Sequence, residues 1–430
     1  GPDSWVDVRM RTSYRPARLG RSAGVYSVIY RIGGSRPVGF RHKVDAVTAL
    51  VVVDTRDDRW TTLQLDPVAD LNSFWGGVDF RDSALTEFSL ATSSRSGSPT
   101  KVVFDGLQFI RVRRTRPEVM QTQTELIDYY AAEFPSVVSH RGVEVSENTP
   151  HLNWFGNPEI FTASNLANRD IRFAVKKIHE AGGVASYNHP YGSSGGPLSA
   201  SQRTTRRRAV TSTLVKERLF KAEILEVGYL GGRAGMLIAD YVAIWDVLSR
   251  NAIFTTGTGT TDDHDGRGWT DIQWRCSTGV WANGTELEPL QRALRSGRAW
   301  FADMAAFSGS VNLLADGYIE MGQAAVIEND RSVLDISVSA IPSDWSIVVV
   351  IGTVDEAGAK QPDPEVTRRS FSPTEVVEGV LSIKVNTTVS RFYRVELHDG
   401  DNICRVYSNP VWLLRELPID RIPAERMAVR

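Results

Sequence analysis

Four short segments of this sequence carry a His, Glu or Asp side chain where a predicted β-strand ends. They are residues 141–146, 151–153, 182–190 and 258–266. In parallel α/β folds the active residues gather at the carboxyl ends of the strands, so these segments can meet in space. Imidazole and carboxylate groups bind Zn²⁺, Mn²⁺ or Fe²⁺, and an open coordination position lowers the pKa of bound water to about 7. The segments therefore predict a metal site suited to hydrolysis.

Length, composition and charge limit the architecture and the partners. The chain has 430 residues, too many for one ordinary core, which predicts two or three domains. The formal net charge of −2 gives no overall attraction to nucleic acid. No apolar run reaches the roughly 20 residues that a membrane-spanning helix needs. The two cysteines, Cys276 and Cys404, make neither a zinc cluster nor a disulfide framework.

Residues 1–114 have the pattern of an all-β module. Clusters of Gly, Ser, Asp and Asn separate short apolar runs at 25–32, 46–53, 60–65, 85–90 and 101–112. This spacing predicts a β-sandwich or jelly roll. The last run resembles the closing strand of galactose-binding-like jelly rolls, and the resemblance implies a carbohydrate as a partner of this module.

From residue 115 to about 305 the pattern changes to alternating helices and strands. Repeated strand–helix units predict a parallel sheet or an α/β barrel. Residues 306–415 return to strand alternation, which predicts a small β-sandwich of the immunoglobulin or fibronectin type. Residues 416–430 form a polar tail.

Residues 192–211 differ in composition from the segments around them. They are rich in Gly and Ser and then contain Arg203, Arg206, Arg207 and Arg208. A structureless loop of this length is usually a lid or a disordered segment. Two interpretations stay open: a solvated loop, or an anion clamp in which Arg206 and Arg207 bind a phosphate substrate.

The order of the chemical motifs resembles the polymerase-and-histidinol-phosphatase (PHP) superfamily. Within residues 136–303 the motifs are Gly-Val-Glu, His-Leu-Asn, Gly-Gly-Val-Ala-Ser-Tyr-Asn-His-Pro, Glu-Val-Gly-Tyr and Asp-Asp-His. Within that superfamily they are most similar to the CehA/McbA group of metallohydrolases. The resemblance implies a distorted seven-stranded α/β barrel that binds up to three metals. It also implies hydrolysis of phosphoesters or, in some members, of carboxylic or carbamate esters.

The resemblance assigns roles to individual residues. Glu144, His151 and His189 match the three protein ligands of one metal, and Glu144 would bridge to a second. Asp262 would serve that second metal and His264 a third, and both would act on water or the leaving group. The expected cofactor is a divalent Zn, Mn or Fe ion, one in the first instance and two with help from Asp262.

The sequence departs from the family at the opening motifs. The family begins its barrel with a His-x-His strand and a Thr-Asp-His strand, and this chain has neither. We therefore expect a reduced barrel in which only the Glu144, His151 and His189 site keeps all its protein ligands. The predicted fold class is multidomain α/β plus all-β, with a reduced PHP-type (β/α) barrel between an N-terminal jelly roll and a C-terminal β-sandwich.

Three further residues lie beside the ligand candidates. Glu226 ends a strand, where it either orients a ligand histidine from the second shell or accepts a structural hydrogen bond. Asn153 and Asn188 flank His151 and His189, where they either hold substrate or water or form turns.

Two classes of function fit these patterns. The first is a metal-dependent hydrolase of a phosphoester or related ester, acting on a small-molecule or glycan-linked substrate. The cost of burying carboxylates and imidazoles without a metal or partners favours it. The second is a catalytically degenerate scaffold in a carbohydrate-binding or virion or cell-surface structural protein. The β modules favour an extracytoplasmic, secreted or virion-associated setting, and the Gly-Pro start suggests a fragment of a longer protein.

Overall fold

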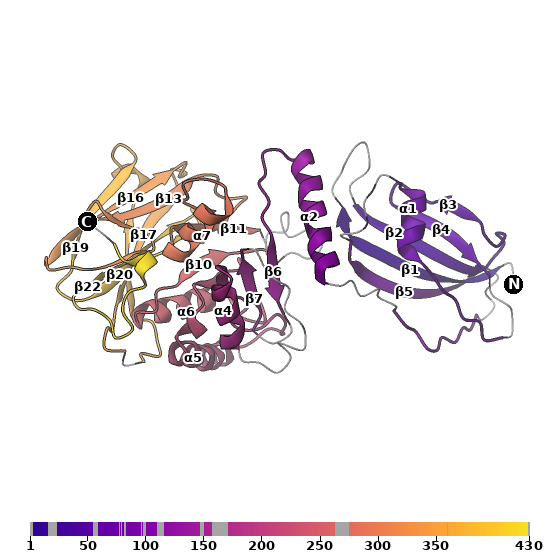
Figure 1. Ribbon diagram of the computed structural model, residues 1–430, viewed down its shortest axis with the longest axis horizontal. Helices are drawn as coiled ribbons and strands as arrows, with labels where there is room; N and C mark the ends of the chain where they lie inside the picture. Colours follow the sequence, from indigo (N-terminus) through magenta and orange to yellow (C-terminus); the bar gives the residue numbers. More distant parts are fainter. Residues whose placement is uncertain are drawn as a thin grey trace. The chain divides into compact units, whose positions relative to one another are not determined.

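The chain folds into two compact units, which are described separately (Figure 1). The computed structural model describes residues 3–15, 24–54, 59–76, 78, 80, 83–95, 97, 100–109, 116–146, 150–156, 171–262, 275–358 and 360–428. The first unit comprises Gly1–Arg114 with Asp262–Trp269, and the second comprises Thr115–Thr261 with Thr270–Arg430. Within the described residues, every helix is too short or too polar to span a bilayer.

The described residues of the first unit form a five-stranded sheet of order β3-β4-β2-β1-β5. Its strands are β1 (Ser4–Arg15), β2 (Gly24–Gly33), β3 (Arg41–Lys43), β4 (Thr48–Val53) and β5 (Leu85–Ser94). β2 and β4 run parallel, and the other neighbours are antiparallel. Helix α1 (Pro67–Phe74) lies across the sheet in Figure 1 and begins at Asp66, whose side chain accepts the N–H of Ala69.

The core of the first unit lies between this sheet and the chain around α1. The ring of Tyr26 on β2 lies 5.0 Å from that of Trp75 and 5.5 Å from that of Phe80. The predicted jelly roll is therefore wrong, because among the described residues of this unit the second layer is a helix and not a second sheet. Residues 60–65 and 101–109 form no strand, and 110–112 lie outside the described residues. Apolar runs between turn residues look alike in both architectures, so their spacing alone could not separate them.

A five-stranded central sheet of order β10-β9-β8-β7-β6 forms part of the second unit. Its strands are β6 (Gly142–Val145), β7 (Leu152–Phe155), β8 (Val184–Tyr187), β9 (Ile224–Gly228) and β10 (Thr256–Gly259). β8, β9 and β10 are parallel, whereas β7 is antiparallel to both β6 and β8. The helices of this region are α2 (Arg116–Glu133), α4 (Ile171–Glu180), α5 (Ala200–Lys216), α6 (Ile238–Arg250) and α7 (Leu287–Ser296).

The predicted reduced PHP-type (β/α) barrel is also wrong. Among the described strands the central sheet is open, with β6 and β10 at its two edges, and no TIM-type barrel closes around it. β6 and β7 pair antiparallel and are separated only by residues 146–151, which breaks the strand–helix alternation of such a barrel. The strands β11 (Cys276–Val280) and β12 (Ala299–Asp303) pair with each other, and β12 also pairs with β21 (Cys404–Ser408) of a C-terminal sheet.

Two sheets complete the second unit. The larger is eight-stranded and follows β11-β12-β21-β20-β17-β18, with β22 paired to β20 and β15 paired to β22. The smaller is four-stranded and follows β14-β13-β16-β19. Both sheets contribute to one apolar core, which includes Leu313, Ile336, Val395 and Leu413. The strands not yet bounded are β13 (Ser310–Ala315), β14 (Ile319–Glu320), β15 (Ala324–Val326), β16 (Arg331–Ser339), β17 (Ser346–Thr353), β18 (Val366–Phe371), β19 (Val380–Asn386), β20 (Arg391–His398) and β22 (Val411–Leu414).

The larger sheet packs against the central region through polar and aromatic contacts. Arg394 of β20 meets Asp246 of α6 with separations of 2.9 Å (Nε to Oδ1) and 3.2 Å (Nη2 to Oδ2), and both side chains are buried. Phe301 of β12, in this sheet, lies 5.9 Å from Trp245 of α6 and stacks on Tyr407 of the neighbouring β21 at 4.8 Å, both between ring centroids. The central sheet and the larger C-terminal sheet are therefore joined within one compact unit.

The polar tail predicted at 416–430 returns to the central sheet. Arg426 is only 2% exposed. Its guanidinium donates to the carbonyl of Gly322 at 3.1 Å and to Oγ1 of Thr256, in β10, at 2.6 Å. Arg426 thus links the segment around residue 426 to β10 of the central sheet.

Candidate metal centre

Three strands bring one carboxylate and two imidazoles to the same edge of the central sheet. Glu144 is the third residue of β6, His151 immediately precedes β7, and His189 follows β8 by two residues. Because β7 is antiparallel to both neighbours, its amino end lies next to the carboxyl ends of β6 and β8. The predicted convergence occurs, although His151 begins its strand and does not end one.

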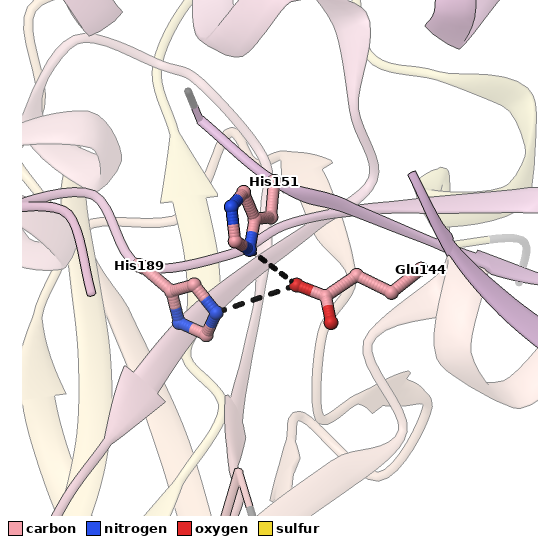
Figure 2. Close-up of side chains that lie close together, drawn as sticks. All are labelled: Glu144, His151 and His189. Atoms are coloured by element: carbon pink, nitrogen blue, oxygen red, sulfur yellow. Dashed lines mark hydrogen bonds and ion pairs between the residues drawn. The ribbon is translucent and has the colours of Figure 1, made fainter. Parts of the chain in front are cut away.

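Both histidine rings turn toward one oxygen of the Glu144 carboxylate, as Figure 2 shows. His151 Nδ1 lies 2.6 Å and His189 Nε2 lies 3.4 Å from Glu144 Oε1. One ligand atom from each of the three residues lies within 4.8 Å of the others. A tetrahedral ion with bonds of about 2.0–2.1 Å holds its ligand atoms about 3.3–3.4 Å apart, so small side-chain rotations suffice for coordination. The group could therefore hold a metal ion.

The charges in the group suit a cation. The hydrogen bond from His189, together with the charge of His151, lowers the pKa of Glu144 to about 2 against partial burial. Burial acts to lower the pKa of His189, but hydrogen bonds to Glu144 and Glu226 raise it above its usual value. The Glu144 carboxylate is thus held ionised, whereas His189 is favoured in its protonated form. A divalent ion that binds both residues would displace the proton of His189.

His189 is held from behind by two side chains at the end of β9. Glu226 Oε2 accepts the main-chain N–H of His189 at 2.9 Å and lies 2.8 Å from His189 Nδ1. Tyr229 places its hydroxyl 2.6 Å from the same Nδ1 and donates a hydrogen bond to Glu226. All three residues are at most 3% exposed. Because Nδ1 is engaged, Nε2 is the ring nitrogen that faces Glu144.

The turn before His189 is fixed by Asn188. The main-chain N–H of Asn188 donates to the carbonyl of His151 at 3.0 Å, and its side-chain oxygen accepts from Ser186 at 2.9 Å. His189 itself has a left-handed backbone (φ 46°), which is uncommon outside glycine. Asn188 is 1% exposed, so its side chain supports the turn from inside the fold.

Asn153 lies beside the group on the adjacent strand. It pairs directly with Glu144 in the β6–β7 register, so the two side chains share a face of the sheet. Its side chain is half-buried. Asn153 is therefore a cross-strand neighbour of Glu144, and its role toward substrate or water stays a prediction.

The segment predicted as an arginine-bearing loop is largely the helix α5, so the loop prediction is wrong. Ser199 caps this helix reciprocally with Gln202, a local signal that ends the loop at residue 199. Arg206 donates to the carbonyl of Ala234 at 2.9 Å, and Arg207 lies 3.5 Å from Asp363. Both guanidinium groups thus have structural partners within the chain, and the anion clamp stays a prediction.

Two further residues, Asp262 and His264, were predicted as metal ligands. His264 lies outside the described residues. Asp262 is described, with φ 47°, but it falls in the first unit, whereas Glu144, His151 and His189 belong to the second. The second metal, which depended on Asp262, stays a prediction.

Sequence reasoning missed two features. Tyr229 received no role, although it follows Glu226 by three residues in the Glu-Val-Gly-Tyr motif. A second group that could hold a metal consists of Glu396, His398 and Cys404. Its signal was the Glu-x-His alternation at the end of a strand, because residues two apart in a strand share a face.

Comparisons with protein-family models, with curated proteins and with solved structures found no match to this chain. The chemistry of the site is therefore what points to a function.

Proposed function

We propose that this protein is a metal-dependent hydrolase of a phosphoester or related ester, with Glu144, His151 and His189 as metal ligands. The observation that carries the proposal is the convergence of these three side chains at one edge of the central sheet. Two imidazoles and one carboxylate are an open hydrolytic set for Zn²⁺, and Mn²⁺ or Fe²⁺ accept the same ligand types. The order of motifs resembling the PHP superfamily supports the same chemistry.

The burial of the three ligands supports a reactive role over a purely structural one. The side chain of His189 is 3% exposed, whereas those of Glu144 and His151 are 30% and 24% exposed. One side of the group is thus anchored in the fold and the other is open to solvent and to a substrate. A divalent ion held there supplies an activated water for ester hydrolysis.

Arg233 supports an anionic ester as the substrate. Its guanidinium lies 5.4 Å from the centre of the Tyr229 ring, and its Nε donates to the carbonyl of Ser193 at 3.1 Å. Its charge acts on both His189 and Tyr229, opposing the charge of Glu226. A positive charge that acts on the site favours an anionic phosphoester over a neutral ester through its field.

The test is metal analysis combined with hydrolysis. The protein is stripped with a chelator, reloaded with Zn²⁺, Mn²⁺ or Fe²⁺, and assayed on generic phosphomonoesters and phosphodiesters. We expect bound metal at the Glu144 group and activity that depends on it, with both lost in Glu144→Ala and His189→Ala. Metal bound without any hydrolysis would instead support the degenerate scaffold.

His179→Ala is the matched control. His179 of α4 also pairs with a carboxylate, Glu223 at 2.8 Å, but it lies outside the candidate group. This variant should keep both metal and activity. Equal loss in His179→Ala and His189→Ala would show that general destabilisation, and not ligand removal, causes the effect.

A further inference from the structure

A second set of metal-ligating side chains lies at the hairpin between β20 and β21. Glu396 and His398 are two residues apart on β20 and so face the same side of the sheet. Cys404, at the start of β21, is the register partner of His398, next to an irregularity between Leu397 and His398. One ligand atom from each of Glu396, His398 and Cys404 lies within 4.8 Å of the others.

His398 is oriented so that Nε2 points at the carboxylate. Nε2 lies 2.9 Å from Glu396 Oε2, and Nδ1 lies 3.2 Å from the side-chain oxygen of Asn402. An amide oxygen only accepts, so this contact places a hydrogen on Nδ1. In neutral His398, Nε2 then carries the lone pair, as in a metal-ligating histidine whose other nitrogen is held by a hydrogen bond.

The second carboxylate oxygen of Glu396 is already fixed by an arginine. Arg394 Nη1 donates to Glu396 Oε1 at 2.6 Å, while the same guanidinium pairs with Asp246. These three side chains are at most 3% exposed. Arg394, Asp246 and Glu396 together carry one positive and two negative charges, a net charge of −1 that is offset either by protonated His398, 2.9 Å from Glu396, or by a bound cation.

Two further groups complete the charge balance. The thiol of Cys404 donates to the carbonyl of Val406 at 3.3 Å, and its deprotonation would bring the cluster to a net charge of −2. Arg368 Nε lies 3.5 Å from Glu396 Oε2, but its side chain is 47% exposed and can turn into solvent. A dication that replaces Arg368 at this oxygen therefore leaves the buried charges neutral.

We propose that Glu396, His398 and Cys404 form a second metal site, selective for a thiophilic divalent ion of the Zn²⁺ class and independent of the Glu144 site. Carboxylate, imidazole and thiolate each bind Zn²⁺ at about 2.0–2.3 Å, and the sulfur ligand favours Zn²⁺ over harder ions. On binding, the Cys404 S–H bond breaks, its proton passes to solvent and a sulfur–metal bond forms. The ion would join β20 to β21 beside α6 and so stabilise the hairpin.

Cobalt(II) separates the two sites, because only the hairpin site contains sulfur. A cobalt–thiolate bond gives a charge-transfer absorption in the near ultraviolet that nitrogen and oxygen ligands do not give. We expect this band in the unmodified protein and in the Glu144→Ala/His189→Ala double variant, and we expect its loss in Cys404→Ser. Cys276→Ser is the matched control and should keep the band, since buried Cys276 lies outside the cluster. A folded unmodified protein without the band would overturn the proposal.

Thiol protection provides a second test that needs no cysteine variant. Zn²⁺ should slow the reaction of Cys404 with a disulfide reagent in the chelator-stripped protein, and His398→Gln should remove that protection. Unchanged reactivity with and without Zn²⁺ would contradict the site. The two proposals fail separately: loss of hydrolysis with the sulfur band intact refutes only the hydrolase, and an absent band with active enzyme refutes only the hairpin site.

Discussion

Glu226 contacts His189 twice, through the main-chain N–H at 2.9 Å and through Nδ1 at 2.8 Å. One carboxylate thus sets both the backbone position and the ring orientation of a candidate ligand. Tyr229 completes the arrangement, because burial and then the charge of Glu226 raise the pKa of its hydroxyl, which stays protonated and donates to Glu226. Glu226 in β9 and Tyr229 immediately after it therefore set the orientation of His189.

Removing this support should weaken metal binding without removing a ligand. We expect Glu226→Gln and Tyr229→Phe to lower metal affinity by roughly 10–100-fold, the usual effect of losing a partner behind a ligand histidine. Competition against a coloured chelator measures the affinity. Tyr241→Phe is the control, since Tyr241 packs 5.5 Å from Tyr229 but donates its hydroxyl to the Arg233 carbonyl. Equal affinities in all three variants would contradict the positioning role.

The stability of the chelator-stripped protein should depend on pH through Glu144 and His189. The pKa of Glu144 is lowered from 4.5 to about 2, so its contribution is present above pH 4.5 and is lost as the pH falls toward 2. The pKa of His189 is raised from 6.5, so its contribution is present below pH 6.5 and is lost as the pH rises through the folded value.

This pair should therefore stabilise the stripped protein most between pH 4.5 and 6.5. Thermal unfolding with a chelator across that window and on both sides of it measures the effect. Glu144→Gln should flatten both limbs, and added metal should reverse the alkaline limb, because its ligands bind deprotonated. A Glu144→Gln profile identical to that of the unmodified protein would count against the coupling.

The buried pair between Arg394 and Asp246 should be essential for stability. Arg394→Met leaves Asp246 buried without its cation, whereas Glu396 keeps its contacts with Arg368 and His398. Breaking a buried pair of this kind costs about 3–5 kcal/mol. Urea unfolding measures the change. Arg292→Met is the control, because Arg292 pairs with Glu288 on the surface of α7, where the side chains are 69% and 72% exposed. An exposed pair of that kind contributes about 0–1 kcal/mol, so similar losses in both variants would refute this prediction.

Two tryptophans test the core of the first unit. Trp75 is 2% exposed and its indole N–H donates to the Ala46 carbonyl at 3.0 Å, whereas Trp60 is 73% exposed. Trp75→Ala should destabilise the unit by about 3–5 kcal/mol through a cavity. Trp60→Ala should change stability by less than about 0.5 kcal/mol. Hydrogen exchange in β2 under mild denaturant reports the difference, and a slow-exchanging β2 in Trp75→Ala would argue against this core.

The sequence predicted the meeting of Glu144, His151 and His189 from the order of the motifs and from strand ends, although His151 precedes its strand and does not end one. It did not predict the sheet that joins them. Hydrophobic periodicity indicates whether a segment is buried. It does not indicate which strand the segment pairs with, or whether the pairing is parallel or antiparallel. The antiparallel strand β7 therefore fitted a predicted barrel equally well. For the same reason the sequence did not predict the fold of the first unit, where β2 and β4 pair in parallel and α1 supplies the second layer.

Side-chain partners across strands were also beyond the sequence patterns. Tyr229 and Glu226 act on His189 only because β8 and β9 are adjacent and parallel. Cys404 meets His398 only because of the irregular register between β20 and β21. Both sets of contacts depend on how separate strands pair, and a local sequence motif does not predict that pairing.

The anchoring of Arg426 on Thr256 and Gly322 has a practical consequence for anyone who dissects this protein. Shortening the gene to end near residue 305 would discard Arg426, Arg394 and Tyr407 in a single step. The remaining polypeptide would expose an unpaired Asp246 and a bare aromatic surface at Phe301, and it should aggregate during expression. Useful boundaries for producing the central sheet thus lie beyond residue 426, and a purification tag is better placed at the other terminus.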